Sequence, residues 1–233
     1  MLKVEAIETY YGDSQVLHGM ELEVNAGEVV TLIGRNGMGK TTLCNALMGL
    51  VKPSSGEITF AGNQLVGESP EKVAGHGIGY VPQGRRLFRS LTVDEHLAML
   101  AKGTRGKRWT PDAVYELFPR LAERRKNGGA ELSGGEQQML AVGRALLLNG
   151  TLVLMDEPSE GLAPTIVDTL IEAVHRLVEE GTAVLIVEQN LRAATSMADR
   201  QLVMVSGRIE AETTAEQLAG DADLQRQYLG VDA

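Results

Sequence analysis

The segment GRNGMGKT, residues 34–41, constrains the fold more than any other part of the chain. It fits the pattern G-x-x-x-x-G-K-[ST] at every fixed position. An apolar run, Val29–Ile33, precedes the segment, and apolar residues at helical spacing follow it, namely Leu43, Ala46, Leu47 and Leu50. A strand, a glycine-rich loop and a helix in direct succession predict one unit of an α/β fold.

Phosphate binding is the chemistry that this segment predicts. Glycines let successive backbone N–H groups turn inward toward phosphate oxygens, and the helix that follows presents its positive N-terminal end. Lys40 can bridge the β- and γ-phosphates, and the Thr41 hydroxyl can complete an octahedral Mg²⁺ shell. A glycine-rich turn without a ligand is the other interpretation, which the complete motif disfavours. The residues expected to contact the nucleotide are Gly34, Asn36, Gly37, Gly39, Lys40, Thr41 and Thr42.

A second apolar run, Thr151–Met155, ends in two adjacent carboxylates, Asp156 and Glu157. A strand at this position would place Asp156 beside the phosphate loop, where it can hold the metal through water. Glu157 would then lie where a water attacks in line with the γ-phosphate. Two carboxylates after a strand can also form an ordinary solvated turn. Together with the complete phosphate loop, the pair is interpreted as a metal-holding Asp156 and a general base, Glu157.

The interval between Lys40 and Asp156 is longer than a compact kinase core needs, so we predict an insertion there. Two amphipathic stretches in it, TVDEHLAMLA and DAVYELFPRLAERR, have helical spacing. Thr92 and Thr110 lie where helices are expected to begin. We therefore predict one domain, residues 1–233, with a mostly helical subdomain at 85–142. Residues 1–84 and 143–233 would form the nucleotide-binding core with its β subdomain.

The composition excludes several classes of protein. A net charge of −9 argues against a nucleic-acid binder, which normally presents a basic face. The single cysteine, Cys44, rules out an intramolecular disulfide and is predicted to pack in a helix as a small apolar residue. The N-terminus, MLKVEAIETYYG, lacks the apolar run of a signal peptide. No stretch approaches the ~20 apolar residues of a membrane-spanning helix, so action at a membrane would need other chains.

The segment LSGGE, residues 132–136, is the most specific of the remaining motifs. With the phosphate loop, Gln83 of VPQ and the pair Asp156-Glu157, it resembles the nucleotide-binding subunit of ATP-binding-cassette (ABC) systems. The order and spacing of these motifs are similar over almost the whole chain. The resemblance implies an α/β fold: a P-loop NTPase (RecA-like) core with an antiparallel β subdomain and an inserted helical subdomain. It also implies ATP and Mg²⁺ as ligands.

The same segment implies a second subunit. In the family, a serine and two glycines at a helix N-terminus contact the γ-phosphate of ATP that another subunit holds, and Ser133, Gly134 and Gly135 match them. A hydroxyl and unobstructed N–H groups at the positive end of a helix suit this contact. An isolated LSGG could also be a chance helix start. Because LSGGE stands at the family's spacing from the phosphate loop and the carboxylate pair, the resemblance implies two cassettes that hold two ATP molecules head to tail.

Further roles follow from the resemblance one position at a time. Tyr11 is similar to the aromatic residue that stacks on adenine, although Tyr10 is adjacent and either tyrosine could instead pack in the core. Leu162 stands where many relatives have an aspartate, in a loop that crosses the dimer interface, and this puts that contact in doubt. Gln83 matches a glutamine that reaches Mg²⁺, so the implied metal-site residues are Thr41, Gln83 and Asp156.

The apolar run 183–187 is followed by Glu188, Gln189 and Asn190, and the family usually has a histidine where Gln189 stands. None of the four histidines of the chain follows this run. A glutamine amide can donate to a γ-phosphate oxygen, but it cannot become cationic as a histidine can. We predict that Gln189 senses the γ-phosphate as a neutral donor beside Glu157. The alternative is a polar strand end without a role in hydrolysis.

A narrower resemblance is to the ATP-binding subunit of branched-chain amino-acid importers (LivF type). It rests on the segments YELFPRLAERR, LSGGEQQMLAVGRAL, DEPSEGLAP, VEQN and QYLG. It implies an ATPase at the cytoplasmic face of the cell membrane, paired with a second cassette that is a different sister subunit or an identical copy. Two permease subunits would be direct partners and an extracytoplasmic solute-binding protein an indirect one. A urea or amide importer, and a non-transport ABC ATPase with soluble partners, are the alternatives.

Overall fold

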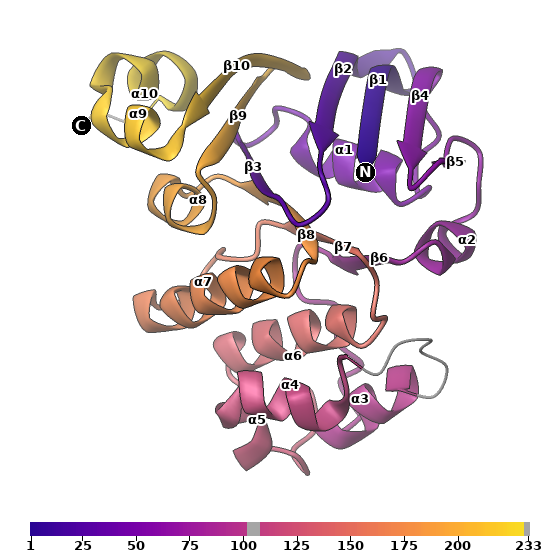
Figure 1. The fold of residues 1–233 in the computed structure, drawn as a ribbon, viewed down its shortest axis with the longest axis vertical. Helices are drawn as coiled ribbons and strands as arrows, with labels where there is room; N and C mark the ends of the chain where they lie inside the picture. Colours follow the sequence, from indigo (N-terminus) through magenta and orange to yellow (C-terminus); the bar gives the residue numbers. More distant parts are fainter. Residues whose placement is uncertain (102–107, 231–233) are drawn as a thin grey trace.

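Two β-sheets of different character organise the chain. The computed structural model describes residues 1–101 and 108–230, so residues 102–107 of the predicted helical subdomain and residues 231–233 lie outside the described part. The larger sheet has six strands in the order β10-β9-β3-β8-β7-β6 (Figure 1). Its strands are β3 Val29–Ile33, β6 Ile78–Val81, β7 Leu152–Asp156, β8 Ala183–Glu188, β9 Arg200–Val205 and β10 Arg208–Thr214.

The centre of this sheet is parallel and buried on both faces. β3 pairs in parallel with β8 and β9, and β7 pairs in parallel with β6 and β8. All residues of β7 and β8 are buried, which agrees with their nearly continuous apolar sequences. Because neighbouring parallel strands end at the same edge, the loops after β3, β8, β7 and β6 meet there. Those four loops contain the phosphate loop, Gln189, Glu157 and Gln83.

The smaller sheet is antiparallel, with the order β2-β1-β4-β5, and confirms the predicted β subdomain. Its strands are β1 Leu2–Tyr11, β2 Ser14–Val24, β4 Ser55–Phe60 and β5 Asn63–Gln64. Apolar residues on its inner face, such as Leu17, Met20 and Phe60, belong to one core with Leu43 and Leu47 of helix α1, Lys40–Leu47. The phosphate loop and its helix therefore lie between the two sheets (Figure 1).

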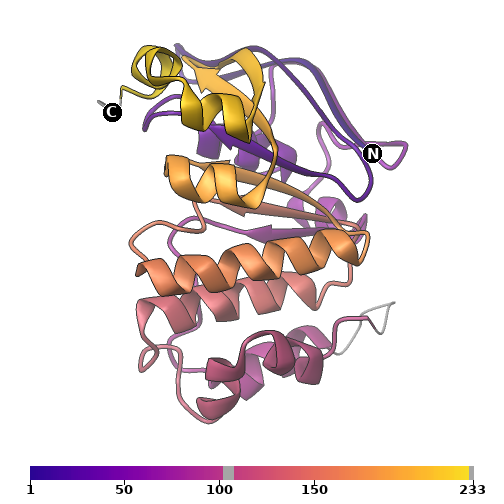
Figure 2. The same cartoon turned by 60° about the vertical axis from the view of Figure 1, so that its left-hand side comes forward.

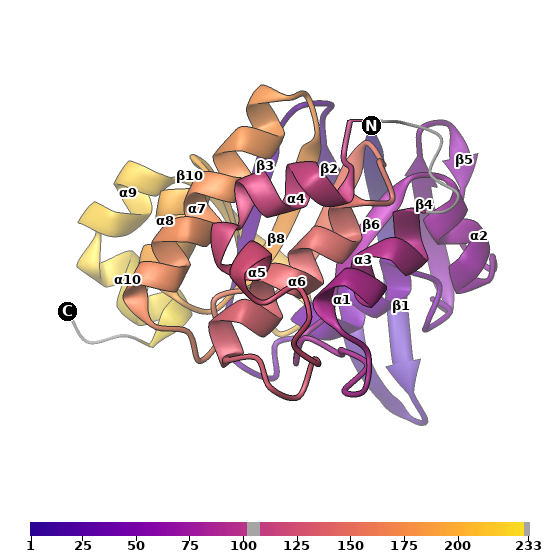
Figure 3. The same cartoon turned by 90° about the horizontal axis from the view of Figure 1, so that it is seen from below.

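Helices cover the other face of the parallel sheet in two layers. Figure 2 shows α6 and α7 against the sheet and α3, α4 and α5 beyond α6; Figure 3 shows these helices from below. A second core joins both layers to β7 and β8. The helices after α1 are α2 Pro70–Gly75, α3 Val93–Ala101, α4 Pro111–Leu117, α5 Pro119–Glu123, α6 Gly134–Leu146, α7 Pro164–Glu179, α8 Leu191–Met197, α9 Ala215–Gly220 and α10 Ala222–Leu229.

The predicted helix starts are confirmed by their hydrogen bonds. The Thr110 side chain accepts from the Ala113 N–H at 3.2 Å, directly before α4. At α3, Thr92 Oγ1 accepts from the Glu95 N–H, and the Glu95 carboxylate accepts in return from the Thr92 N–H. Such reciprocal bonds satisfy N–H groups that a helix terminus would otherwise leave without partners. Within the predicted interval 85–142 the described elements are helices, and α6 continues beyond it to Leu146.

Two details differ from the prediction. The strand expected at Thr151–Met155 runs from Leu152 to Asp156, so the first carboxylate is its last residue. Leu50 was expected on the apolar face of the helix after the phosphate loop, and this is wrong: α1 ends at Leu47, and Leu50 is 51% exposed. The chain turns at Gly49, whose φ of +68° stops the helix. Among the described residues, no helix is long and apolar enough to cross a membrane.

Candidate active site

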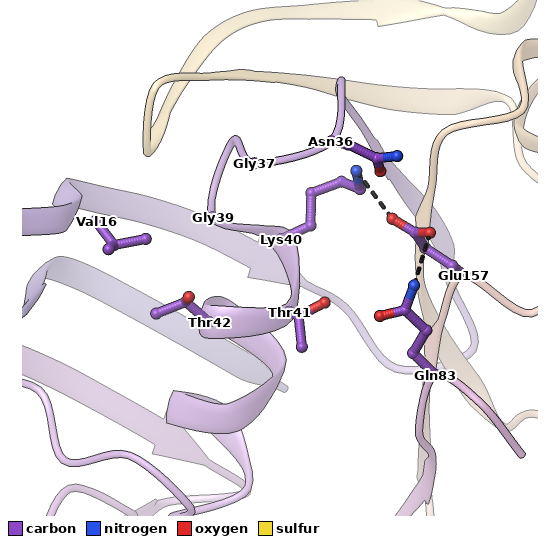
Figure 4. Close-up of a pocket in the computed structure, with 9 residues that line it drawn as sticks. All are labelled: Val16, Asn36, Gly37, Gly39, Lys40, Thr41, Thr42, Gln83 and Glu157. Atoms are coloured by element: carbon purple, nitrogen blue, oxygen red, sulfur yellow. Dashed lines mark hydrogen bonds and ion pairs between the residues drawn. The ribbon is translucent and has the colours of Figure 1, made fainter. Parts of the chain in front are cut away.

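The phosphate loop lines a cavity of about 320 Å³ at the edge where the parallel strands end. Gly37 and Gly39 have φ values of +80° and +101°, a region that residues with a Cβ rarely adopt. The Lys40 ammonium donates to the carbonyl oxygens of Gly34 at 2.8 Å and Arg35 at 3.0 Å. The cavity is lined by Val16, Asn36, Gly37, Gly39, Lys40, Thr41, Thr42, Gln83 and Glu157 (Figure 4).

Asp156 offers an acceptor that the protein leaves without a partner. Its Oδ1 accepts from the Thr41 hydroxyl at 3.4 Å, whereas Oδ2 is buried with no hydrogen bond. Burial raises the pKa of Asp156 to about 6, and the negative charge of Glu157 acts in the same direction. A buried carboxylate oxygen that receives no hydrogen bond can ligate a cation, and a hydroxyl oxygen lies beside it. Mg²⁺ prefers such oxygen ligands. The residues present therefore fit the predicted metal.

Glu157 is held in a defined position by three elements. Its φ of +48° lies in the left-handed region, and its N–H donates to the Val187 carbonyl oxygen of β8 at 2.8 Å. Its carboxylate forms an ion pair with Lys40 at 3.0 Å, and both side chains are more than nine-tenths buried. Gln83 Nε2 donates to the same carboxylate at 3.2 Å (Figure 4). Backbone strain and a buried ion pair at one residue are typical of a functional position.

Gln83 lies two residues beyond β6 and reaches two carboxylates. Its Nε2 donates to Glu157 at 3.2 Å and to Glu160 at 3.1 Å. Nearby, Arg85 Nη2 donates to the Glu160 carbonyl oxygen at 3.4 Å. Gln83 thereby connects the loop that leads into the helical layer with the loop that follows Glu157.

The LSGGE segment forms the start of helix α6, as its sequence predicts. Ser133 caps the helix: its hydroxyl accepts from the Glu136 N–H, and the Glu136 carboxylate accepts from the Ser133 N–H at 2.8 Å. A Cβ added to Gly135 would lie 2.9 Å from Ile166 Cγ1, so any side chain at this position would force Ile166 to shift. None of Ser133, Gly134 and Gly135 is among the residues that line the cavity around Lys40.

The two candidate tyrosines lie at the end of β1 and are both exposed. Tyr10 is 41% and Tyr11 is 50% exposed, so neither packs in the core. Neither is among the residues that line the cavity of the phosphate loop. Val16 of β2 lines that cavity instead. Nothing in the residue type of Val16 would have indicated this position from the sequence.

Gln189 is not among the residues that line the cavity around Lys40 and Thr41. It lines a second cavity, of about 400 Å³, with Gly34, Arg35, Asn36, Leu229 and Gly230. Asn36 lines both cavities, so Gln189 and Glu157 border the same loop from neighbouring strands. Leu162, at the position where an aspartate is common, closes a short turn through a bond from its N–H to the Ser159 carbonyl oxygen at 3.2 Å.

Comparison with known sequences identifies relatives of this chain. A family model described as ABC transporter matches residues 17–160. The chain is 45% identical over 232 residues to the high-affinity branched-chain amino acid transport ATP-binding protein BraG of Pseudomonas aeruginosa, covering 99% of this chain and 100% of BraG. It is 34% identical to the lipopolysaccharide export system ATP-binding protein LptB of Haemophilus influenzae, covering 99% and 97% of the two chains.

Comparison with solved structures extends this likeness to the whole fold. A dimeric ATP-binding cassette in a post-hydrolysis state, bound to ADP and Pi, superposes with a TM-score of 0.82 at 25% identity. The superposition covers 92% of this chain and 99% of that chain. The arrangement of a parallel sheet, an antiparallel sheet and a helical layer is thus shared with a protein that holds nucleotide products as a dimer.

Proposed function

Because this chain belongs to the ABC transporter family, we propose that it is the ATP-hydrolysing subunit of an importer for branched-chain amino acids. It is an ATPase of the cassette type, with a P-loop NTPase fold. One observation carries the proposal: the ends of three parallel strands, β3, β6 and β7, bring Lys40, Thr41, Gln83 and Glu157 to one cavity, with Asp156 hydrogen-bonded to Thr41 beside it. This set combines phosphate binding, a metal site and a carboxylate base.

We assign the phosphate loop to the phosphates of ATP and Tyr11, exposed at the end of β1, to its adenine. Thr41, Asp156 and Gln83 would hold Mg²⁺, which supplies positive charge to the phosphate oxygens when bound. The ion pair between Lys40 and Glu157 gives the site a further property. Phosphate oxygens compete with the Glu157 carboxylate for Lys40, so ATP binding releases Glu157 to accept a proton from the attacking water.

A second cassette would complete each site. Ser133, Gly134 and Gly135 lie at the start of α6 and outside the cavity of their own phosphate loop, which leaves them available to ATP on a partner. A structural neighbour that is dimeric with ADP and Pi supports this arrangement. The partner is a sister cassette or a second copy of this chain. In the same proposal, residues 85–142 form the helical subdomain and Gln189 acts at the γ-phosphate.

The membrane step of transport would fall to other chains. We place the protein at the cytoplasmic face of the membrane, bound to two permease subunits, with a solute-binding protein on the far side. The identity to BraG, 45%, exceeds that to the export protein LptB, 34%, and supports import of branched-chain amino acids. Affinity purification of the tagged chain from its own membranes tests this. Co-purification of two permeases and a cassette is expected, and their consistent absence would count against a transport role.

A further inference from the structure

One buried carboxylate has no role in the site as described so far. Glu188, the last residue of β8, is 1% exposed. Its Oε1 accepts from the Ser159 N–H at 2.9 Å. Its Oε2 accepts from the N–H groups of Gln189 at 3.0 Å and Asn190 at 3.2 Å. A single side chain thus receives three backbone hydrogen bonds from two segments that are far apart in the sequence.

Burial of the Glu188 carboxylate costs free energy that its three hydrogen bonds to backbone N–H groups must offset. A buried carboxylate is costly unless hydrogen bonds compensate it, and burial raises the pKa of Glu188. The three N–H groups provide that compensation, and each would be left without this acceptor if the carboxylate were removed. The two oxygens are divided between the segments: one binds the loop after Glu157, and the other binds the segment that begins with Gln189.

The main chain of the same region adds two further connections. The Glu188 carbonyl oxygen accepts from the Gly34 N–H, the first residue of the phosphate loop, at 3.2 Å. The preceding residue, Val187, accepts from the Glu157 N–H at 2.8 Å. The end of β8 is therefore the point at which the phosphate loop, the base and the Gln189 segment are joined by hydrogen bonds.

We propose that Glu188 is a positioning residue for ATP hydrolysis, whose carboxylate couples the Ser159–Leu162 loop to Gln189. A shift of that loop is transmitted through Ser159 N–H and the rigid carboxylate to the backbone of Gln189. Glu157 lies two residues before Ser159, so the hydrogen bonds of the Glu188 carboxylate also fix the position of the base relative to Gln189. This inference rests on the roles proposed above for Glu157 and Gln189.

The test compares three variants in the transport complex isolated with this chain. Glu188→Gln keeps the size of the side chain but turns an NH₂ group toward backbone N–H donors. Glu188→Asp keeps the charge but is one methylene shorter, so it cannot reach both Ser159 and the Gln189 segment. Glu28→Gln is the matched control: this carboxylate accepts from the Asn25 N–H at 2.7 Å and pairs with Arg200 at 3.0 Å, before the start of β3 and at the opposite edge of the sheet.

We expect both Glu188 variants to lower kcat by about 10- to 100-fold, with the KM for ATP within about 3-fold of wild type, because small misplacements affect the reacting geometry more than binding. Glu28→Gln should lower the thermal midpoint and leave kcat within about 2-fold. A Glu188→Gln variant with wild-type kcat would overturn the proposal. A loss of kcat in Glu28→Gln equal to that in Glu188→Gln would also overturn it, because general destabilisation would then explain both.

A double variant, Glu188→Gln with Gln189→Ala, tests the coupling itself. If the carboxylate acts through Gln189, the double variant should be no slower than the slower single variant, within about 3-fold. Losses that multiply would overturn the coupling. Failure of the proposed function has a different signature: wild-type turnover in Gln189→Ala alone would refute the role of Gln189, whatever the kcat of Glu188→Gln.

Discussion

The ion pair between Lys40 and Glu157 predicts that Glu157→Gln will bind ATP more tightly while it almost ceases to hydrolyse it. The two charged groups are 3.0 Å apart and both are buried. At an effective dielectric constant of about 20, their attraction is about 5 kcal/mol, most of which offsets the cost of burying the two charges. ATP must displace this carboxylate from Lys40 in the wild-type protein, and the amide of the variant removes that competition.

The change in the dissociation constant for ATP depends on how much of this attraction the wild-type protein loses when ATP binds. If only about 1.4 kcal/mol of it does, the dissociation constant for ATP falls about 10-fold. Lys40 stays ordered in the variant through its bonds to the Gly34 and Arg35 carbonyl oxygens. Loss of the general base should reduce kcat by about 10²- to 10⁴-fold.

Isothermal titration with ATP and a phosphate-release assay measure the two effects. Glu160→Gln is the control, because it removes the same charge from a carboxylate that accepts from Gln83 but lies outside the ion pair. Its dissociation constant should change by less than about 2-fold, since an exposed charge is screened by salt. Weaker ATP binding by Glu157→Gln than by wild type would refute the competition, and a kcat above about a tenth of wild type would refute the base.

Three further predictions follow from the same geometry. Gln189→Ala should slow hydrolysis and leave the ATP dissociation constant nearly unchanged; equal turnover in steady-state assays would contradict this. Gly135→Ala places a Cβ 2.9 Å from Ile166 Cγ1, so Ile166 must shift, and the variant should lower both the thermal midpoint of the isolated chain and kcat; full activity would be inconsistent with a glycine-dependent contact. Burial raises the pKa of Asp156 to about 6, so the folded chain without nucleotide holds this proton more tightly than the unfolded chain. Its stability relative to Asp156→Asn should therefore fall as pH rises from about 4 to about 6, and denaturant titrations that show a constant difference would contradict the assignment.

Much of the site was predictable because local pattern and chemistry coincide there. Gly37 and Gly39 have φ values that other residues avoid, so the glycines of the motif predict the conformation of the loop. Asp156 at the end of β7, Glu157 directly after it and the amide after β8 follow buried apolar runs, and parallel strands place such ends at one edge. The helix starts at Thr92 and Thr110 carried their capping residues in the sequence.

Other features depend on contacts that sequence spacing does not contain. Leu50 continues the helical period, but the positive φ of Gly49 ends the helix before it. Val16 lines the phosphate-loop cavity only because β2 packs against that loop: a Cβ added to Gly39 would lie 3.2 Å from Val16 Cγ1. Glu188 carried a signal, a charge at the end of a fully apolar run, yet its bond to Ser159 joins residues 29 positions apart. The ion pair between Lys40 and Glu157 likewise arises only when β3 and β7 end at one edge.

Transport by the reconstituted complex decides whether this ATP site drives uptake of branched-chain amino acids. Proteoliposomes that contain the complex purified with this chain are given ATP on the side of the cassettes and radiolabelled leucine, with the solute-binding protein, on the other. ATP-dependent leucine accumulation is expected, and it should be abolished in complexes with Glu157→Gln. No accumulation of leucine, isoleucine or valine by a complex that hydrolyses ATP, or uptake of urea in their place, would contradict the claim.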